Sequence, residues 1–247
     1  MNTKILAILS LCLATFVCAQ SSPLVGTPAP REHRGFYSST SFSFAYNWYD
    51  ASEYDGKSFG SEKYRDMEYF EYNGFTYPMM EFKFGVALGN LVALYSVFNL
   101  GFYIGAMDYR YEEYKEVCDE DDICVPILEE DETEEFSSAD AYSFRSFVGF
   151  GTTVYPFRDK KSPLNGLFVS SAIGYTLFVT VINSNDENAY GNGGIGYEME
   201  IGKEWWINDH MAIGVGLGFA HSSLVWHTVD SHKSDNVLSL SFRITRG

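Results

Sequence analysis

The stretch Met211-Ala-Ile-Gly-Val-Gly-Leu-Gly-Phe219 places a large apolar residue at every second position, with alanine or glycine between. A period of two is the period of a β-strand, whose successive side chains point to opposite faces. One face of this strand is therefore continuously apolar, and the other carries almost no side-chain bulk. A half-exposed soluble sheet would show a polar second face, so the pattern favours a strand between lipid and a narrow, closely packed interior.

The same alternation recurs from Phe36 to the end of the chain. The segment Leu238-Ser-Leu-Ser-Phe-Arg-Ile244, for example, alternates apolar residues with serine or arginine. We predict about eight strands, at residues 36–49, 76–89, 92–110, 140–156, 166–182, 193–206, 210–221 and 235–246.

The connections between these strands alternate in length. Short links at 89–91, 157–165 and 207–209 separate mostly longer, polar links at 50–75, 111–139, 183–192 and 222–234. Short periplasmic turns and longer external loops are typical of outer-membrane barrels, which have an even number of strands. The sequence therefore predicts an all-β fold, a closed antiparallel up-and-down transmembrane barrel over residues 36–247.

The N-terminus has the three parts of a secretory signal. Lys4 is followed by an apolar run at 5–17 and by the small residue Ala19, which predicts a signal peptide at 1–19. Lipidation at Cys18 is the less favoured alternative, because Phe16-Val17 are not small. Residues 20–35 are rich in proline and serine and predict a flexible periplasmic leader.

In their eight alternating segments and loop asymmetry, and in the signal peptide that precedes them, residues 36–247 resemble the small outer-membrane barrels of Gram-negative bacteria, the OmpA/OmpX type. The segment at 238–244 resembles their C-terminal assembly signal, although the chain ends Thr245-Arg246-Gly247 without an aromatic residue. The resemblance implies an outer-membrane location, contact with outer-membrane lipid, and help from the barrel-assembly machinery and periplasmic chaperones during biogenesis.

Two other architectures fit less well. A helical membrane protein would use 84–107 and 164–182, but glycine and asparagine interrupt both stretches and their apolar residues keep a step of two. A lipocalin-like soluble barrel would enclose a large apolar cavity, whereas the glycine-rich face predicts a narrow interior.

The formal net charge is −16, and acidic residues crowd the predicted external loop at 111–139. This charge argues against nucleic acid as a partner. The loop could attract a basic extracellular partner or a divalent cation, but the plainer interpretation is a solvated charge run, since no EF-hand spacing is present. We predict no cofactor.

Cys118 and Cys124 are the two cysteines left outside the signal. In an oxidising compartment we expect them to form a disulfide. A zinc site would need further cysteine or histidine ligands nearby, and the sequence has none there.

Six charged residues fall on the predicted inner face, where each needs a partner because a bare buried ion is costly. We predict either a paired network that plugs the lumen, which eight strands favour, or a gated polar path. The residues are Glu81, Lys83, Arg145, Glu198, Glu200 and Arg243.

His221 and Ser223 would share the outward face of one strand, as a base and a nucleophile require. This loosely resembles the outer-membrane lipid A deacylases, but Leu224 stands where that family has asparagine, and Asp230 would have to orient the histidine. A polar strand end is the plainer interpretation. A rim metal site at His221, His227 and His232 is weaker still, and His33 and His210 look incidental.

Three functions stay open: a structural or surface-interaction protein, a narrow channel for small or apolar solutes, and a lipid-modifying enzyme. We favour the first, because the loops of a rigid scaffold are its usual working surface.

Overall fold

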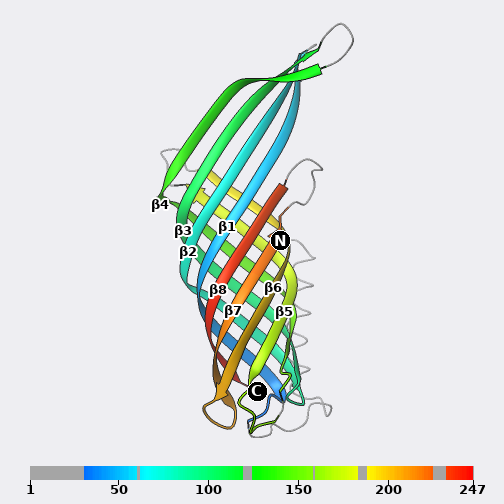
Figure 1. Cartoon of the computed structure of the whole chain (residues 1–247), viewed down its shortest axis with the longest axis vertical. Coiled ribbons are helices and arrows are strands. Elements are labelled where there is room, and N and C mark those ends of the chain that lie inside the picture. Colours follow the sequence, from blue (N-terminus) through cyan, green and yellow to red (C-terminus); the bar gives the residue numbers. More distant parts are fainter. Residues whose placement is uncertain are drawn as a thin grey trace, which may run out of the picture.

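The computed structural model describes residues 31–59, 62–118, 124–157, 159–182, 188–224 and 232–246. In these residues eight antiparallel strands follow one another in chain order, and β8 pairs with β1 to close the ring (Figure 1). The predicted closed up-and-down barrel is confirmed. The strands are β1 (Gly35–Phe59), β2 (Glu62–Leu88), β3 (Val92–Cys118), β4 (Cys124–Val154), β5 (Leu167–Ile182), β6 (Asn188–Trp206), β7 (Met211–Ser223) and β8 (His232–Arg246).

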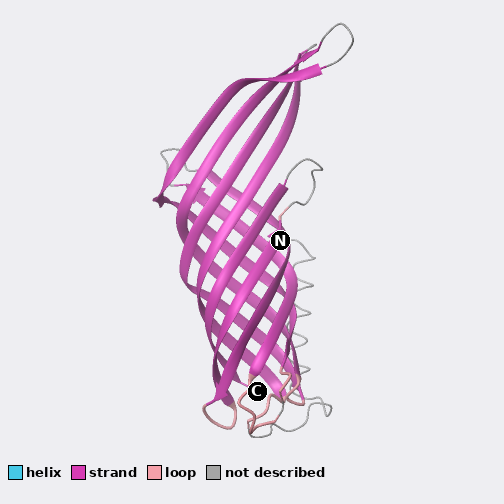
Figure 2. Ribbon diagram, viewed as in Figure 1, coloured by secondary structure: helices cyan, strands magenta, loops and turns pink. Residues whose placement is uncertain are grey.

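Strands and their connecting turns make up the described chain (Figure 2). Within that part of the molecule, no helix has the length and apolarity needed to cross a membrane. The two stretches weighed as membrane helices belong instead to β2 and β3 and to β5.

The two faces of the barrel are as the alternation predicts. Along β7 exposed or half-exposed residues alternate with buried ones over the whole strand. Phe102, Ile173 and Leu240 are exposed on the outside, whereas Asn47 and Thr176 are fully buried inside. The outward apolar side chains form a continuous surface, which we call the apolar belt, and burying it in lipid is strongly favourable.

One bulge in β2 changes which residues face inward. Thr76 and Met79 are buried, but Tyr77 and Pro78 between them are both exposed, Tyr77 to 76%. The pairing with β1 shifts at the same place, since Ala45 lies opposite Thr76 and Ser43 opposite Met79. Proline cannot donate to the ladder, and a bulge is one of the few sheet positions that accept it.

The first four strands are much longer than predicted. The links expected at 50–75 and 111–139 are mostly strand, so the prediction of loops there was wrong. β1 pairs with β8 only as far as Ser52. β4 pairs with β5 only from Ala141 to Val154. Beyond those points β1 to β4 continue as an open four-stranded sheet that rises past the other strands (Figure 1).

We call this open part the outer sheet and define it as residues 53–59, 62–68, 111–118 and 124–132. It stands at the end opposite the short turns and the C-terminus, which we call the turn end (Figure 1). A sheet that leaves the membrane no longer needs an apolar face toward lipid. Its strands therefore lack the alternation by which the membrane part is recognised.

Candidate functional site: a filled lumen below an acidic outer sheet

The lumen holds a buried ionic cluster around Arg145 of β4. Its Nε lies 2.7 Å from Asp235 Oδ2, and its Nη1 lies 3.2 Å from Glu198 Oε1. Asn47 donates to Asp235 Oδ1 at 2.5 Å, and Asn99 donates to Glu198 Oε1 at 3.1 Å. Strands on opposite sides of the barrel are thereby joined across its axis, and each buried charge has partners.

A second cluster lies closer to the turn end. Lys83 Nζ is 2.7 Å from Glu81 Oε1 and 3.0 Å from Glu200 Oε2. Arg243 Nη1 approaches the same Glu200 oxygen at 3.3 Å, and the Ser241 hydroxyl donates to Glu200 Oε1 at 2.7 Å. Glu200 is therefore the shared anion between two cations of β2 and β8.

Glu204 of β6 anchors a third group, which closes the turn end. Arg243 Nε lies 3.0 Å from its Oε1, and the Thr245 hydroxyl donates to the same oxygen at 2.8 Å. Its other oxygen accepts from the Tyr155 hydroxyl at 3.3 Å and lies 3.1 Å from His33 Nε2. One buried carboxylate thus binds four residues from three separate segments of the chain.

His33 was expected to be incidental and part of a flexible leader, and its position corrects that expectation. It is only 2% exposed, its ring stacks on Tyr155 at 4.1 Å between centroids, and it lies 4.6 Å from the Trp206 ring. His33 and Asn90 exchange two hydrogen bonds, at 3.0 and 2.9 Å. We call residues 31–34 the N-terminal strap, because they are fixed across the turn end of the lumen.

Glycines of β7 make room for these ion pairs. A Cβ added at Gly216 would meet Glu200 Oε1 at 2.3 Å, and one at Gly214 would meet Glu204 Cγ at 2.8 Å. The bulk-free face seen in the sequence is therefore the surface on which the carboxylates of β6 rest. This is the close approach that a glycine inside a strand permits.

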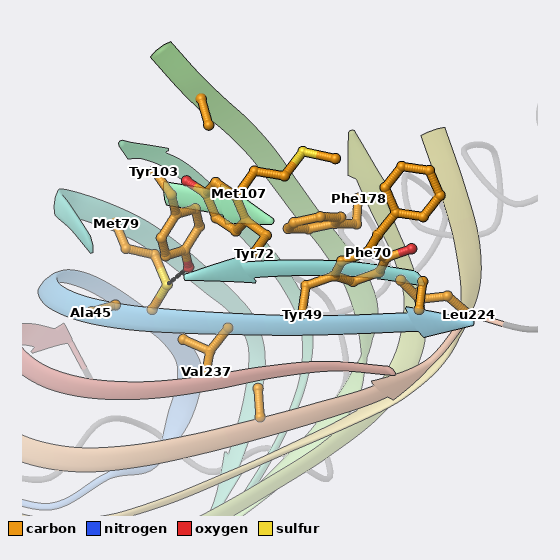
Figure 3. Close-up of a cluster of buried hydrophobic side chains, with 13 residues drawn as sticks. Ala45, Tyr49, Phe70, Tyr72, Met79, Tyr103, Met107, Phe178, Leu224 and Val237 are labelled. Carbon is orange, nitrogen blue, oxygen red and sulfur yellow. Dashed lines mark hydrogen bonds between the residues drawn. The ribbon is translucent and has the colours of Figure 1, made fainter. Parts of the chain in front are cut away.

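The outer half of the lumen is apolar rather than ionic. Tyr49 stacks on Phe178 at 4.6 Å between centroids, and Tyr72 lies beside them (Figure 3). Tyr103 donates its hydroxyl to Met79 Sδ at 3.4 Å. These side chains belong to one buried cluster. Rings of this size fill the bore at the level where the strands approach the outer rim.

Little space is left between the two ionic clusters around Arg145 and Glu200. The cavity there, lined by Lys83, Asn99, Arg145 and Glu198 among others, has a volume of about 40 Å³. That is room for about three waters. The interior is consequently a filled, charge-paired core with one small polar pocket lined by the residues above.

All six charged residues expected in the lumen line it, and the contacts above join them in two groups. Arg145 pairs with Glu198, and Glu81, Lys83, Glu200 and Arg243 form the other group. Two further anions, Glu204 and Asp235, were missed. Glu204 continues the step of two from Glu198 and Glu200, so the pattern could have revealed it. Asp235 stands at the first position of the last predicted strand and is in step with Ser241 and Arg243, so the pattern could have revealed it as well.

His221 and Ser223 lie on the outward face of β7, as expected. His221 Nδ1 lies 2.8 Å from the side-chain oxygen of Asn236, an amide rather than a carboxylate. Asp230 and His227 lie outside the described residues, and the His232 side chain is not described. Within the described part of the chain, no group of three or more histidine, cysteine or acidic residues could hold a metal ion.

Cys118 is the last residue of β3 and Cys124 the first of β4, and the two are direct partners in the ladder. Their side chains are not described, so the disulfide stays a prediction. The signal peptide expected at 1–19 lies outside the described residues.

A closed eight-stranded barrel with an apolar exterior, a polar filled interior and short turns at one end is a small β-barrel protein of the bacterial outer membrane. No protein-family model matches the chain, and neither does any curated protein sequence.

Solved structures with a similar arrangement are outer-membrane proteins. Ail, the attachment invasion locus protein of Yersinia pestis, is 11% identical, with a TM-score of 0.38 over 84% of this chain and 97% of Ail. OprG of Pseudomonas aeruginosa is 10% identical, with a TM-score of 0.36 over 87% and 98%. The outer membrane protease OmpT of Escherichia coli is 7% identical, with a TM-score of 0.34 over 92% and 99%. Similarity at this level carries nothing about function.

Proposed function

We propose that this protein is a surface-interaction protein of the outer membrane, whose barrel anchors the outer sheet as a rigid binding surface. The observation that carries the proposal is the unequal length of the strands. β1 to β4 keep pairing with one another up to Phe59–Glu62 and Cys118–Cys124, well past the points at which β5 and β8 stop. A membrane anchor alone would not need this extension.

The charge of the outer sheet supports a basic partner. Its four segments contain twelve acidic residues against four basic ones. A surface with such an excess of one sign raises the local concentration of oppositely charged ligands and speeds their association. Of the acidic residues expected in the external loop at 111–139, those at 112–116 and 130–135 stand instead on paired strands.

The interior argues against the channel alternative. The aromatic cluster, the two ionic clusters and the N-terminal strap occupy successive levels of the lumen. Conduction would require ion pairs such as Arg145–Asp235 to separate within a low-dielectric interior, which is costly. The enzyme alternative would need His221 and Ser223 to act together, whereas His221 Nδ1 lies 2.8 Å from the side-chain oxygen of Asn236.

A shortened protein tests the proposal. Ser52 pairs with Tyr69, Tyr69 with Arg110, and Arg110 with Thr133, so these residues form one row across four strands. Joining Ser52 to Tyr69 and Arg110 to Thr133 by Asn-Gly turns removes the outer sheet without disturbing the barrel register.

We expect this short-sheet variant to keep the mobility shift between unboiled and boiled samples in SDS, as the intact protein should. Only the intact protein should bind protamine, a basic probe, at physiological salt. Equal protamine binding by both proteins would overturn the proposal. Steady conductance of the intact protein in planar bilayers would favour the channel alternative instead.

A further inference from the structure

We propose that the small cavity between the two ionic clusters of the lumen binds one monovalent metal cation, sodium or potassium, through side-chain oxygens of Glu198 and Asn99. The bound cation completes the charge balance of the buried core and links β6 to β3. This inference does not depend on the proposed function, because it concerns the interior of the barrel rather than the outer sheet.

The buried core has more carboxylates than positive charges. Among the described residues, three permanent cations face the lumen: Lys83, Arg145 and Arg243. Five carboxylates face it as well: Glu81, Glu198, Glu200, Glu204 and Asp235. His33, when protonated, adds a fourth positive charge beside Glu204, so at least one negative charge remains in excess. An uncompensated charge is costly in a low-dielectric interior, and buried charges are therefore paired or coordinate a metal ion.

The excess charge lies in the cluster around Arg145. There a single guanidinium faces two carboxylates, Asp235 at 2.7 Å and Glu198 at 3.2 Å. The contacts around Glu200 and Glu204, by contrast, bring three positive groups to three carboxylates once His33 is protonated. Of the two carboxylates bound to Arg145, Glu198 lines the cavity. The negative charge that needs a cation is therefore at the wall of the available space.

Asn99 supplies a second oxygen at the same cavity. Its side chain is buried, lines the cavity and donates Nδ2 to Glu198 Oε1 at 3.1 Å. In the part of the chain that the structure describes, its Oδ1 has no hydrogen-bond partner. Leaving a buried acceptor unsatisfied is unfavourable, whereas carbonyl and carboxylate oxygens are the ligands that hard cations prefer. A cation between Glu198 and Asn99 satisfies both groups.

The size and charge of the cavity select the ion. Its volume of about 40 Å³ accommodates one ion together with one or two waters. Lys83 and Arg145 also line it, but each already faces two carboxylates. The excess around Arg145 is a single negative charge, which a monovalent cation neutralises and a divalent one would exceed.

A proton on Glu198 would be the other way to remove the excess charge. Arg145 Nη1 and Asn99 Nδ2 both donate to Glu198 Oε1. Donors of this kind favour the charged carboxylate over the neutral acid. The two possibilities differ in one measurable respect, because a proton would make the protein indifferent to the metal cation in solution.

Unfolding in different chloride salts tests the inference. The full protein in lipid vesicles is unfolded with urea at neutral pH in sodium, potassium or N-methylglucamine chloride at equal ionic strength. The last cation is too large for the cavity. A cation bound only to the folded state favours folding by mass action, so we expect a folding equilibrium constant roughly tenfold higher in the better metal salt than in N-methylglucamine chloride. Equal stability in all three salts would overturn the inference.

Matched variants separate the cavity from general effects of the salts. Glu198→Gln removes the excess charge but keeps an oxygen that can accept from Arg145 and Asn99. Its control is Asp209→Asn, which loses the same charge at the exposed turn end. We expect Glu198→Gln to reduce the difference between salts to about twofold or less, and Asp209→Asn to leave it as in the unaltered protein. The same salt dependence in both variants would contradict binding at Glu198.

Thallium(I) gives a direct measurement on the unaltered protein. This ion substitutes for potassium and scatters X-rays anomalously. In crystals grown with thallium(I), we expect an anomalous difference peak in the lumen between Glu198 and Asn99. A lumen without such a peak would refute the inference, and stability that responds to pH but not to the metal cation would replace the cation by a proton on Glu198.

Discussion

The Nε2 atom of His33 lies 3.1 Å from Oε2 of Glu204, although His33 precedes the first strand and Glu204 stands near the end of the sixth. Both side chains are almost completely buried. Glu204 also receives Arg243, Thr245 and Tyr155. The N-terminal strap is therefore part of the buried ionic core. Its residues 31–34 close the lumen at the turn end.

Replacing His33 should loosen this closure. His33→Ala removes one partner of a buried carboxylate together with a stacked ring, and we expect it to lower the free energy of unfolding by about 1–3 kcal/mol. Urea unfolding in lipid vesicles, followed by tryptophan fluorescence, measures this. Arg31→Ala is the control, since its contact with Asp209 is exposed and should contribute about 0–1 kcal/mol. Equal effects of the two changes would mean that the strap does not stabilise the fold.

Removing Arg145 should be more damaging. Arg145→Met leaves Asp235 and Glu198 buried without their cation, and a loss of about 3–5 kcal/mol is typical when one member of a buried pair is removed. Combining it with Asp235→Asn and Glu198→Gln removes the stranded charges, so most of the loss should return. The same urea experiment decides this, and a triple variant no more stable than Arg145→Met would contradict the account.

The apolar belt can be tested with one substitution made at two places. Leu240 is 60% exposed on the barrel exterior, and Leu128 is 45% exposed on the outer sheet. Arginine at a lipid-facing position near the bilayer midplane costs about 2–4 kcal/mol, so Leu240→Arg should destabilise the protein in vesicles by that amount. Leu128→Arg should change stability by about 0.5 kcal/mol or less. Similar losses for both would place Leu240 outside the membrane.

Cys118 and Cys124 should be joined by a disulfide in protein isolated from the cell envelope. They are direct partners in the β3–β4 ladder, and the envelope is oxidising. Mass spectrometry of the non-reduced protein should show a mass two hydrogens below that of the reduced one. A Cys118→Ser, Cys124→Ser variant should still insert, because the pair stands at the tip of the outer sheet, far from the barrel. Free thiols in freshly isolated, alkylated protein would refute the prediction.

The barrel itself could be predicted because membrane strands obey a strong local rule. Each residue of a lipid-spanning strand faces either lipid or lumen, so runs such as Met211–Phe219 and Leu238–Ile244 display the period of two directly. The inward position of Lys83, Arg145 and Glu200 followed from the same parity. At the bulge of Tyr77-Pro78 the alternation of inward and outward residues shifts by one position. The predicted second strand begins just before this bulge, at Thr76.

By itself the sequence determined the strand count, the closed topology and which side chains face lipid, because each depends on a repeat within one strand. Tertiary structure alone decided which charges meet, that His33 fills the turn end, and that the acidic segments pair into the outer sheet. Those features depend on the register between strands and on contacts between residues far apart in the chain. Outside the membrane no lipid selects for apolar residues, so the strands of the outer sheet carry no local pattern from which they could be recognised.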